Sequence, residues 1–170
     1  MKNTPALSAA LTAALLLASG SAFSQTNTAT MGVSMTVAAE CTLSTGDLAF
    51  GSVGILDANL DASTNITVQC TEGSPYKIGL SAGAGASATV ASRKMTHATD
   101  TTKVANYSLY KDSGHLNVWG NTLTETVDSA AATGADEVIP VYGRVFTGQN
   151  VPTGAYADTI TATITYGTGL

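Results

Sequence analysis

The stretch 29–37 alternates strictly between apolar residues and small or polar ones. Because successive side chains of a β-strand point to opposite faces, this pattern predicts a strand with one apolar face. A helix would scatter the same residues around its circumference. The residues of the apolar face are Ala29, Met31, Val33, Met35 and Val37.

The first 24 residues have the features of a secretory signal peptide. Lys2 precedes an apolar run at 6–18, and small residues follow at 19–24. The apolar run is shorter than the roughly 20 residues that a transmembrane helix needs. We therefore predict cleavage before Gln25 and export of a chain with one domain.

Cys41 and Cys70 are the two cysteines of the chain. In an exported protein such a pair predicts a disulfide, with two free thiols as the alternative. Cys70 ends an alternating run and shares the parity of Ile66 and Val68. Its side chain is therefore expected to point into the core.

Charged residues are few, at 11% of the chain, and the net charge is −5 at pH 7. No basic cluster is dense enough to follow a phosphate backbone, so nucleic acid is not an expected partner. Long charged side chains normally keep exposed sheet edges apart. Their scarcity here is unusual for a soluble monomer.

Short alternating runs separated by turn signals continue to the end of the chain, and no stretch after residue 24 has a convincing helical period. This pattern predicts an antiparallel β-sandwich. Pro140 favours a sheet edge or a bulge over a sheet centre. The expected strands are 41–51, broken by a turn at 45–47, and then 64–71, 76–80, 105–111, 115–120, 137–146 and 158–166. The expected loops are 57–63, 81–102 and 128–136.

Several motifs resemble, as a set and in order, the spore coat U domain family, which includes pilin subunits of archaic (Csu-type) chaperone–usher pili. Trp119 follows both cysteines instead of lying between them, which differs from an antibody domain. The matching stretches are Cys41-x-Leu, Leu48-x-Phe50-Gly, Cys70, Arg93-x-Met95, Tyr107-x-Leu-Tyr-x-Asp112, Trp119-Gly, Val141-Tyr142-Gly-Arg144, Val151-Pro-x-Gly-x-Tyr-x-Asp-Thr-Ile160 and Thr163-Ile164-Thr-Tyr166.

The resemblance implies an incomplete immunoglobulin-like sandwich that lacks its last strand and is completed by the N-terminal donor strand of a neighbouring subunit. It implies a donor-strand extension at 25–40 and a pilin domain at 41–170. It also implies a structural, non-enzymatic subunit of a surface pilus, with a periplasmic chaperone, an outer-membrane usher and other pilins as partners. The residues expected in the family core are Phe50, Tyr107, Trp119, Tyr142, Ile160, Ile164 and Tyr166.

Three alternatives remain open on the residues. The stretch 29–37 could be the first strand of its own domain, paired in cis. Trp119 and the tyrosines could line a carbohydrate site in a minor adaptor or lectin-like subunit. The chain could also be a surface coat protein that forms no fibre.

Motifs for catalysis or cofactor binding are weak. Residues 79–83 match G-x-S-x-G around Ser81 without a following helix, and 83–88 resemble a degenerate dinucleotide loop without a βαβ unit. The run 57–61 begins like a calcium loop but lacks its glycine and its glutamate. His97 and His115 lie far apart in sequence, without further soft ligands nearby. We therefore expect no enzyme activity, no cofactor and no metal.

Overall fold

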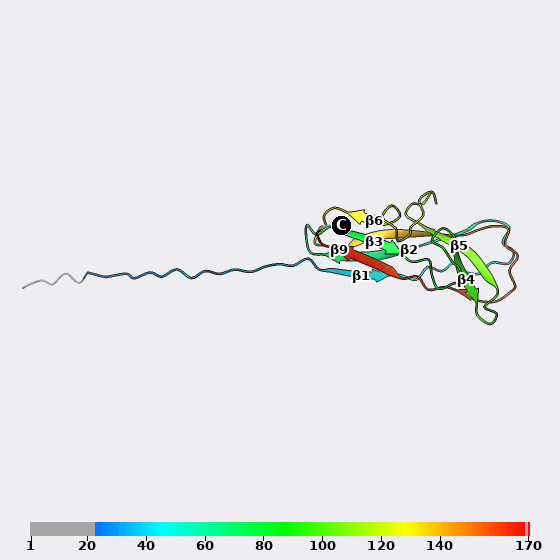
Figure 1. Cartoon of the computed structure of the whole chain (residues 1–170), viewed down its shortest axis with the longest axis horizontal. Helices are drawn as coiled ribbons and strands as arrows, with labels where there is room; N and C mark the ends of the chain where they lie inside the picture. Colours follow the sequence, from blue (N-terminus) through cyan, green and yellow to red (C-terminus); the bar gives the residue numbers. More distant parts are fainter. Residues whose placement is uncertain (1–22, 169) are drawn as a thin grey trace, which may run out of the picture. The chain divides into compact units, whose positions relative to one another are not determined.

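The computed structural model describes residues 23–168 and residue 170. The chain divides into two units, one ending at Met35 and one formed by Thr36–Leu170, and every strand belongs to the second (Figure 1). The predicted signal peptide, apart from its last two residues, lies outside the described residues. Across the described part of the chain, no helix is long and apolar enough to cross a membrane.

The domain is built from nine β-strands, and the described residues contain no helix. This confirms the all-β prediction. The strands are β1 (Cys41–Thr45), β2 (Leu60–Cys70), β3 (Tyr76–Leu80), β4 (Arg93–His97), β5 (Val104–Tyr110), β6 (Val127–Ser129), β7 (Glu137–Val145), β8 (Tyr156–Ala157) and β9 (Ala162–Tyr166).

Two antiparallel sheets form the sandwich. One sheet has the strand order β1-β2-β7-β5-β4-β8, and the other has the order β6-β3-β9. The longest ladder joins β2 to β7, from Leu60 opposite Val145 to Val68 opposite Glu137. The chain changes sheets between β8, which pairs with β4, and β9, which pairs with β3. Consequently β1 and β9 are edge strands of different sheets.

The core lies between the two sheets and follows the period-two pattern of the sequence. Ile66, Val68 and Cys70 are buried on one face of β2, and Trp119 and Tyr107 are buried as predicted. Phe50, Ile160 and Ile164 are half-buried and pack against this core.

Two of the expected core residues lie elsewhere. Tyr142 has the opposite parity to the buried Val141, so it faces the outer side of β7 and packs edge-on against His115. Tyr166 is the last residue of β9 and is 41% exposed, because the sheet ends there.

The disulfide between Cys41 and Cys70 is confirmed. The two residues are direct partners in the β1–β2 ladder, with their Cα atoms 4.1 Å apart. The covalent link therefore joins the first residue of β1 to the last residue of β2.

Several predicted strand boundaries were wrong. The polar run 57–63 is not all loop, because β2 begins at Leu60 and the bidentate pair between Asp61 and Arg144 joins it to β7. The run 81–102 contains β4, which pairs with β5 and β8. The run 115–120 forms only a single bridge, between Val118 and Tyr110. The run 158–166 is a strand only from Ala162 onward.

Pro140 lies in β7, which is a central strand, so the prediction of an edge strand is wrong for β7 as a whole. Locally the reasoning holds, because β5 pairs only with residues 142–145 of β7. The remaining stretch, 137–141, pairs with β2 alone among the described strands. Pro140 therefore lies where a missing N–H disturbs no second ladder.

Candidate functional site

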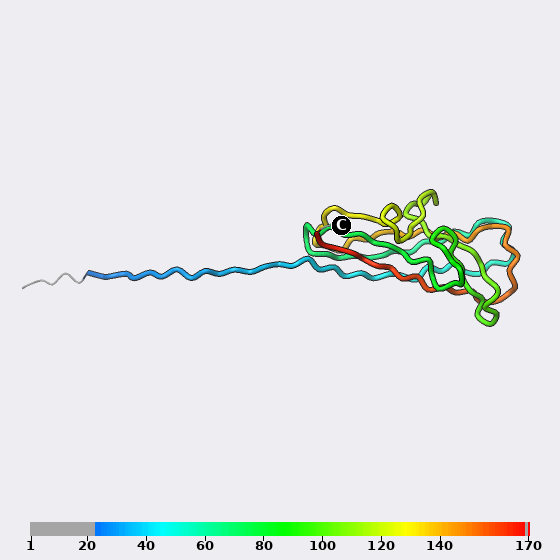
Figure 2. The backbone as a smooth tube through the Cα atoms, in the orientation of Figure 1, coloured from blue at the N-terminus to red at the C-terminus, as the bar shows by residue number. Residues whose placement is uncertain are grey.

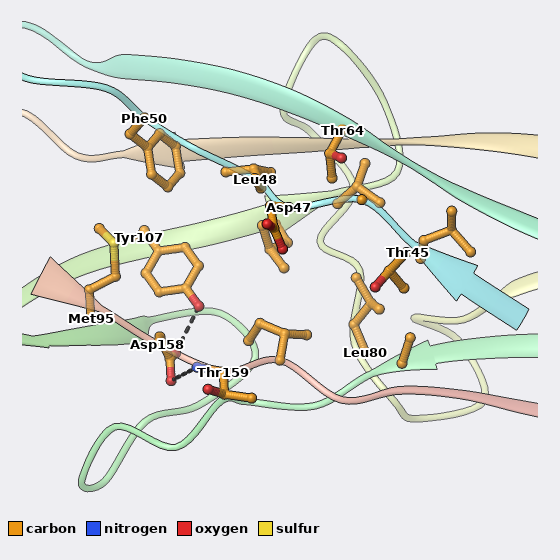
Figure 3. Close-up of a pocket in the computed structure, with 16 residues that line it drawn as sticks. Thr45, Asp47, Leu48, Phe50, Thr64, Leu80, Met95, Tyr107, Asp158 and Thr159 are labelled. Carbon is orange, nitrogen blue, oxygen red and sulfur yellow. Dashed lines mark hydrogen bonds between the residues drawn. The ribbon is translucent and has the colours of Figure 1, made fainter.

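A groove opens on one side of the sandwich, where the segment after β1 faces the crossover from β8 to β9 (Figure 3). The cavity has a volume of about 320 Å³. Both sheets contribute apolar side chains to its lining, together with polar residues such as Thr45, Asp47 and Thr159. The apolar lining includes Leu48, Phe50, Ile66, Met95, Leu109 and Ile160.

The groove is open because the two segments that face each other have no common ladder. The amide of Gly46 still donates to the carbonyl of Asn65, but residues 47–50 belong to no strand. On the opposite side, β3 is the one strand among residues 23–168 that pairs with β9. Exposed edges of this kind can accept a further strand.

Leu48 and Phe50 turn toward the core because Gly143 leaves room for them. A Cβ atom built on Gly143 would lie 2.9 Å from carbon atoms of both side chains. Phe50 also packs edge-on against Tyr107, with ring centroids 6.1 Å apart. The unpaired segment is thus held by side-chain packing rather than by backbone hydrogen bonds.

Where both edge strands are present, β1 and β9 lie close together. Cα atoms of β1 and β9 approach to within 8 Å, although no ladder joins these two strands, which lie side by side in Figure 1. An intervening strand would need its two neighbours about 9.6 Å apart, since paired strands are spaced by about 4.8 Å. To admit a strand between them, β1 and β9 would have to separate by at least about 1.6 Å.

A polar contact lies in the wall of the open part of the groove. The Tyr107 hydroxyl donates to Asp158 Oδ2 at 2.7 Å, and the amides of Ala84 and Thr159 donate to Asp158 Oδ1 at 2.7 and 2.8 Å. Burial and the hydrogen bond to Asp158 raise the pKa of Tyr107 above its usual range. Asp158 therefore connects β5, the 81–85 loop and the crossover that borders the groove.

The loop beside Asp158 depends on Gly83. This residue has φ +88°, and a Cβ atom there would overlap the Asp158 carboxylate. A left-handed conformation and close contact both favour glycine. The first residues of the small-residue run 82–91 therefore pack closely against the Asp158 carboxylate.

Arg93 is fully buried and stabilises the end of β3. Its guanidinium donates to the carbonyls of Leu80, Ser81, Val90 and Trp119, at distances from 2.6 to 3.3 Å. Burial lowers its pKa. Leu80 lines the groove, so this network helps to position one of its walls. Sequence reasoning treated Arg93 and Asp158 only as parts of motifs. A lone arginine and a lone aspartate among small residues were the available signals.

The sequence matches the family model of the Spore Coat Protein U domain over residues 27–163. The chain belongs to the Spore Coat Protein U domain family. It is 36% identical to Protein U of Myxococcus xanthus over 175 residues, which cover 95% of this chain and 97% of that protein.

A solved structure shares the fold of this Spore Coat Protein U domain. It is the CsuC–CsuE chaperone–tip adhesion subunit pre-assembly complex from archaic chaperone–usher Csu pili of Acinetobacter baumannii. The TM-score is 0.54 at 22% identity, and the match covers 76% of this chain but 40% of that chain. The resemblance is confirmed, as is the prediction of an immunoglobulin-like sandwich that lacks its last strand.

The residues predicted to form a donor strand precede the sandwich. Residues 23–40 contain no strand and are exposed. Exposure is 85% for Met31, 88% for Val33, 86% for Met35 and 66% for Val37, and Ala29 is also exposed. A first strand paired in cis is therefore not present in the described residues. The donor role itself stays a prediction.

The other candidate sites lack the geometry that their chemistry needs. Ser81 Oγ accepts hydrogen bonds from the amides of Gly83 and Thr161, and no histidine is among its partners. Asp61 lies in β2 and forms an ion pair with Arg144 of β7, so it is not part of a calcium-binding loop. Trp119 is 0% exposed and donates to the carbonyl of Ile78, so it cannot stack on a sugar. The described residues contain no cluster of three or more metal-ligating side chains.

Proposed function

We propose that the protein is a structural, non-enzymatic subunit of a surface fibre assembled by donor-strand exchange. One observation carries the proposal: the sandwich has an apolar groove between two unpaired edges, while the same chain has an unpaired, exposed segment of alternating apolar residues. Adding a strand supplies backbone hydrogen bonds and places alternate side chains in apolar pockets.

In this proposal, Ala29, Met31, Val33, Met35 and Val37 of one subunit enter the groove of the next. Burying each large side chain is worth about 1.5 to 3 kcal/mol before the ordering cost is subtracted. Because donor and acceptor surfaces differ, the contact is head-to-tail and does not close on itself. Repetition of the contact would generate a filament.

The proposed partners follow from the open groove and from the fold shared with the chaperone-bound tip subunit. A periplasmic chaperone would cover the groove before assembly, and an outer-membrane usher would join the subunits. The proposed route is export through the periplasm to the cell surface, after cleavage before Gln25. The proposed use of the fibre is adhesion and biofilm formation.

The test is a self-complemented variant. A second copy of residues 25–39, fused after Leu170 through a flexible linker, should give a soluble monomer that melts at a markedly higher temperature and no longer polymerises. A fusion with Val33→Lys in the second copy is the negative control, and one with Ser34→Lys is the matched positive control. The groove proposal is wrong if the intact fusion leaves the melting temperature and the oligomeric state unchanged.

A non-fibrous surface coat protein is the second candidate, favoured by the match to the Spore Coat Protein U domain. A minor adaptor subunit would be part of the same proposed fibre. If that subunit bound carbohydrate, the buried Trp119 could not be one of its contacts. Chaperone and usher genes next to this gene would support the fibre. Their absence would support the coat protein.

A further inference from the structure

The loop between Phe50 and Leu56 exposes large apolar side chains at a site separate from the groove floor. Val53 is 51% exposed and Ile55 is 83% exposed, and residues 51–56 carry no charge. Leu56 is buried, and its carbonyl accepts hydrogen bonds from the Gly148 amide and the Thr147 hydroxyl. The loop is therefore anchored at its end while its apolar side chains face outward.

The loop continues directly from the groove. Phe50 lines the groove, and Gly51, at φ +75°, turns the chain away from it. In Figure 2 this segment, in cyan, lies at the end of the domain opposite to the start of β1. A strand lying in the groove with its C-terminal end toward Phe50 would leave the groove beside Val53 and Ile55.

The opposite end of the domain is occupied by its own chain. The Glu40 amide donates to Thr71 Oγ1 at 3.1 Å, and the Thr71 hydroxyl donates to the carbonyl of Ala38 at 3.2 Å. These bonds attach the exit of the extension beside Cys41. A second domain arriving at that end would meet this segment, so the next subunit is placed at the Phe50 end.

We propose that the 51–56 loop forms a second contact between successive subunits, in which Val53 and Ile55 pack against residues 38 and 39 of the incoming copy. This inference rests on the proposed donor-strand function and names the partner surface beside the groove. The incoming residues are Ala38 and Ala39, which directly follow the proposed groove residue Val37 and are apolar, uncharged and exposed. Apolar surfaces of this kind are buried when they meet.

The experiment compares two variants of the mature chain. Val53→Asp with Ile55→Asp places charges in the proposed contact, and Leu123→Asp is the matched control, because Leu123 is also highly exposed, at 79%, but lies outside the 51–56 loop. Two measurements are made on each protein: the affinity for a synthetic peptide of residues 25–37, which fills the groove alone, and the rate at which preformed polymers dissociate in denaturant.

The double variant should bind the peptide as the unsubstituted chain does, and its polymers should dissociate at least tenfold faster. The Leu123→Asp protein should match the unsubstituted chain in both measurements. Unchanged dissociation of the double variant would overturn the second contact, and so would an equal acceleration by Leu123→Asp. A peptide that fails to bind the unsubstituted chain would instead overturn the donor-strand function itself.

Discussion

The two ends of the space between β1 and β9 are built differently. At the Cys41 end, a disulfide and the β1–β2 ladder fix β1 within its own sheet, and the bond between the Tyr76 hydroxyl and Glu137 joins the two sheets. At the Phe50 end, residues 47–50 and 158–161 belong to no strand, and side-chain contacts around Tyr107 and Asp158 hold them. The Cys41 end therefore stabilises the domain, and in the proposed assembly the Phe50 end receives the partner.

The largest expected effect tests whether the groove at the Phe50 end receives the extension of a neighbouring subunit. Val33→Lys would place a charge in an apolar groove, which should weaken the subunit contact by several kcal/mol, on the order of 3 to 5. Ser34→Lys has the opposite parity and should cost less than about 1 kcal/mol, as ordinary surface changes do. The ladder of polymer species on unboiled gels measures both.

The chaperone-bound subunit should fold normally in both variants. Equal loss of polymer with Val33→Lys and Ser34→Lys would refute the parity of the groove. Loss of the chaperone-bound fold in the Val33 variant would show that residue 33 serves its own domain.

The next effect tests how much the disulfide at the Cys41 end stabilises the domain. Replacing Cys41 and Cys70 by serine removes a link that spans 29 residues of sequence. The chain-entropy estimate for such a loop is roughly 3.5 kcal/mol of unfolding free energy. Denaturant unfolding of the self-complemented fusion measures it.

The affinity of a folded cysteine-free subunit for the donor peptide should change much less than its stability. A parallel loss of stability and peptide affinity would mean that the two ends are coupled. The distinction drawn between them would then fail.

A smaller effect is expected at the polar contact in the groove wall. Tyr107→Phe keeps the ring against Phe50 but removes the donor to Asp158. One lost hydrogen bond should cost about 1 kcal/mol, with up to about 3 if Asp158 is left unsatisfied. Donor-peptide affinity should fall more than in a Tyr110→Phe control, whose hydroxyl has no hydrogen bond to Asp158. If the two variants bind the donor peptide equally well, the hydrogen bond between Tyr107 and Asp158 does not contribute to donor binding.

The smallest effect is a pH dependence of stability that comes from Tyr76 and Glu137 at the Cys41 end. The hydrogen bond from Tyr76 lowers the pKa of Glu137 from 4.5, so its stabilisation is present above about pH 4.5 and is lost as the pH falls through the lower folded value. Burial and the bond to Glu137 raise the pKa of Tyr76 from 10.0 to about 12, so stability also falls as the pH rises above 10.0. Melting temperatures across both pH ranges measure these losses of stability, and Glu137→Gln should reduce the loss at acid pH. If the loss of stability at acid pH is the same in that variant, it arises from other carboxylates.

Much of the fold could be predicted from the sequence because the core strands alternate with period two. The parity of Cys70 with Ile66 and Val68 correctly placed the disulfide against the core. The first half of β2 escaped prediction because Asp61 looks like a loop residue until Arg144, far along the chain, pairs with it. The break before β9 escaped because Asp158 binds the backbone of Ala84, a contact between distant segments.

The groove itself could be predicted only through resemblance to a family. A missing strand leaves no mark on local periodicity, since the flanking residues are apolar in either case. The wall residues Arg93 and Asp158 act through backbone groups of other segments, and such groups have no signature in the sequence.

Pro140 has a consequence for the fidelity of assembly. Among the described strands, β2 alone pairs with the stretch 137–141 of β7, so this stretch is a second place where a stray strand could attach. Proline offers no N–H at that position, which makes the stretch a poor template for strand addition. The edge of β9 contains no proline. In the proposed assembly, an incoming extension is thus directed away from this stretch of β7 and toward the groove, which favours a linear chain over branching.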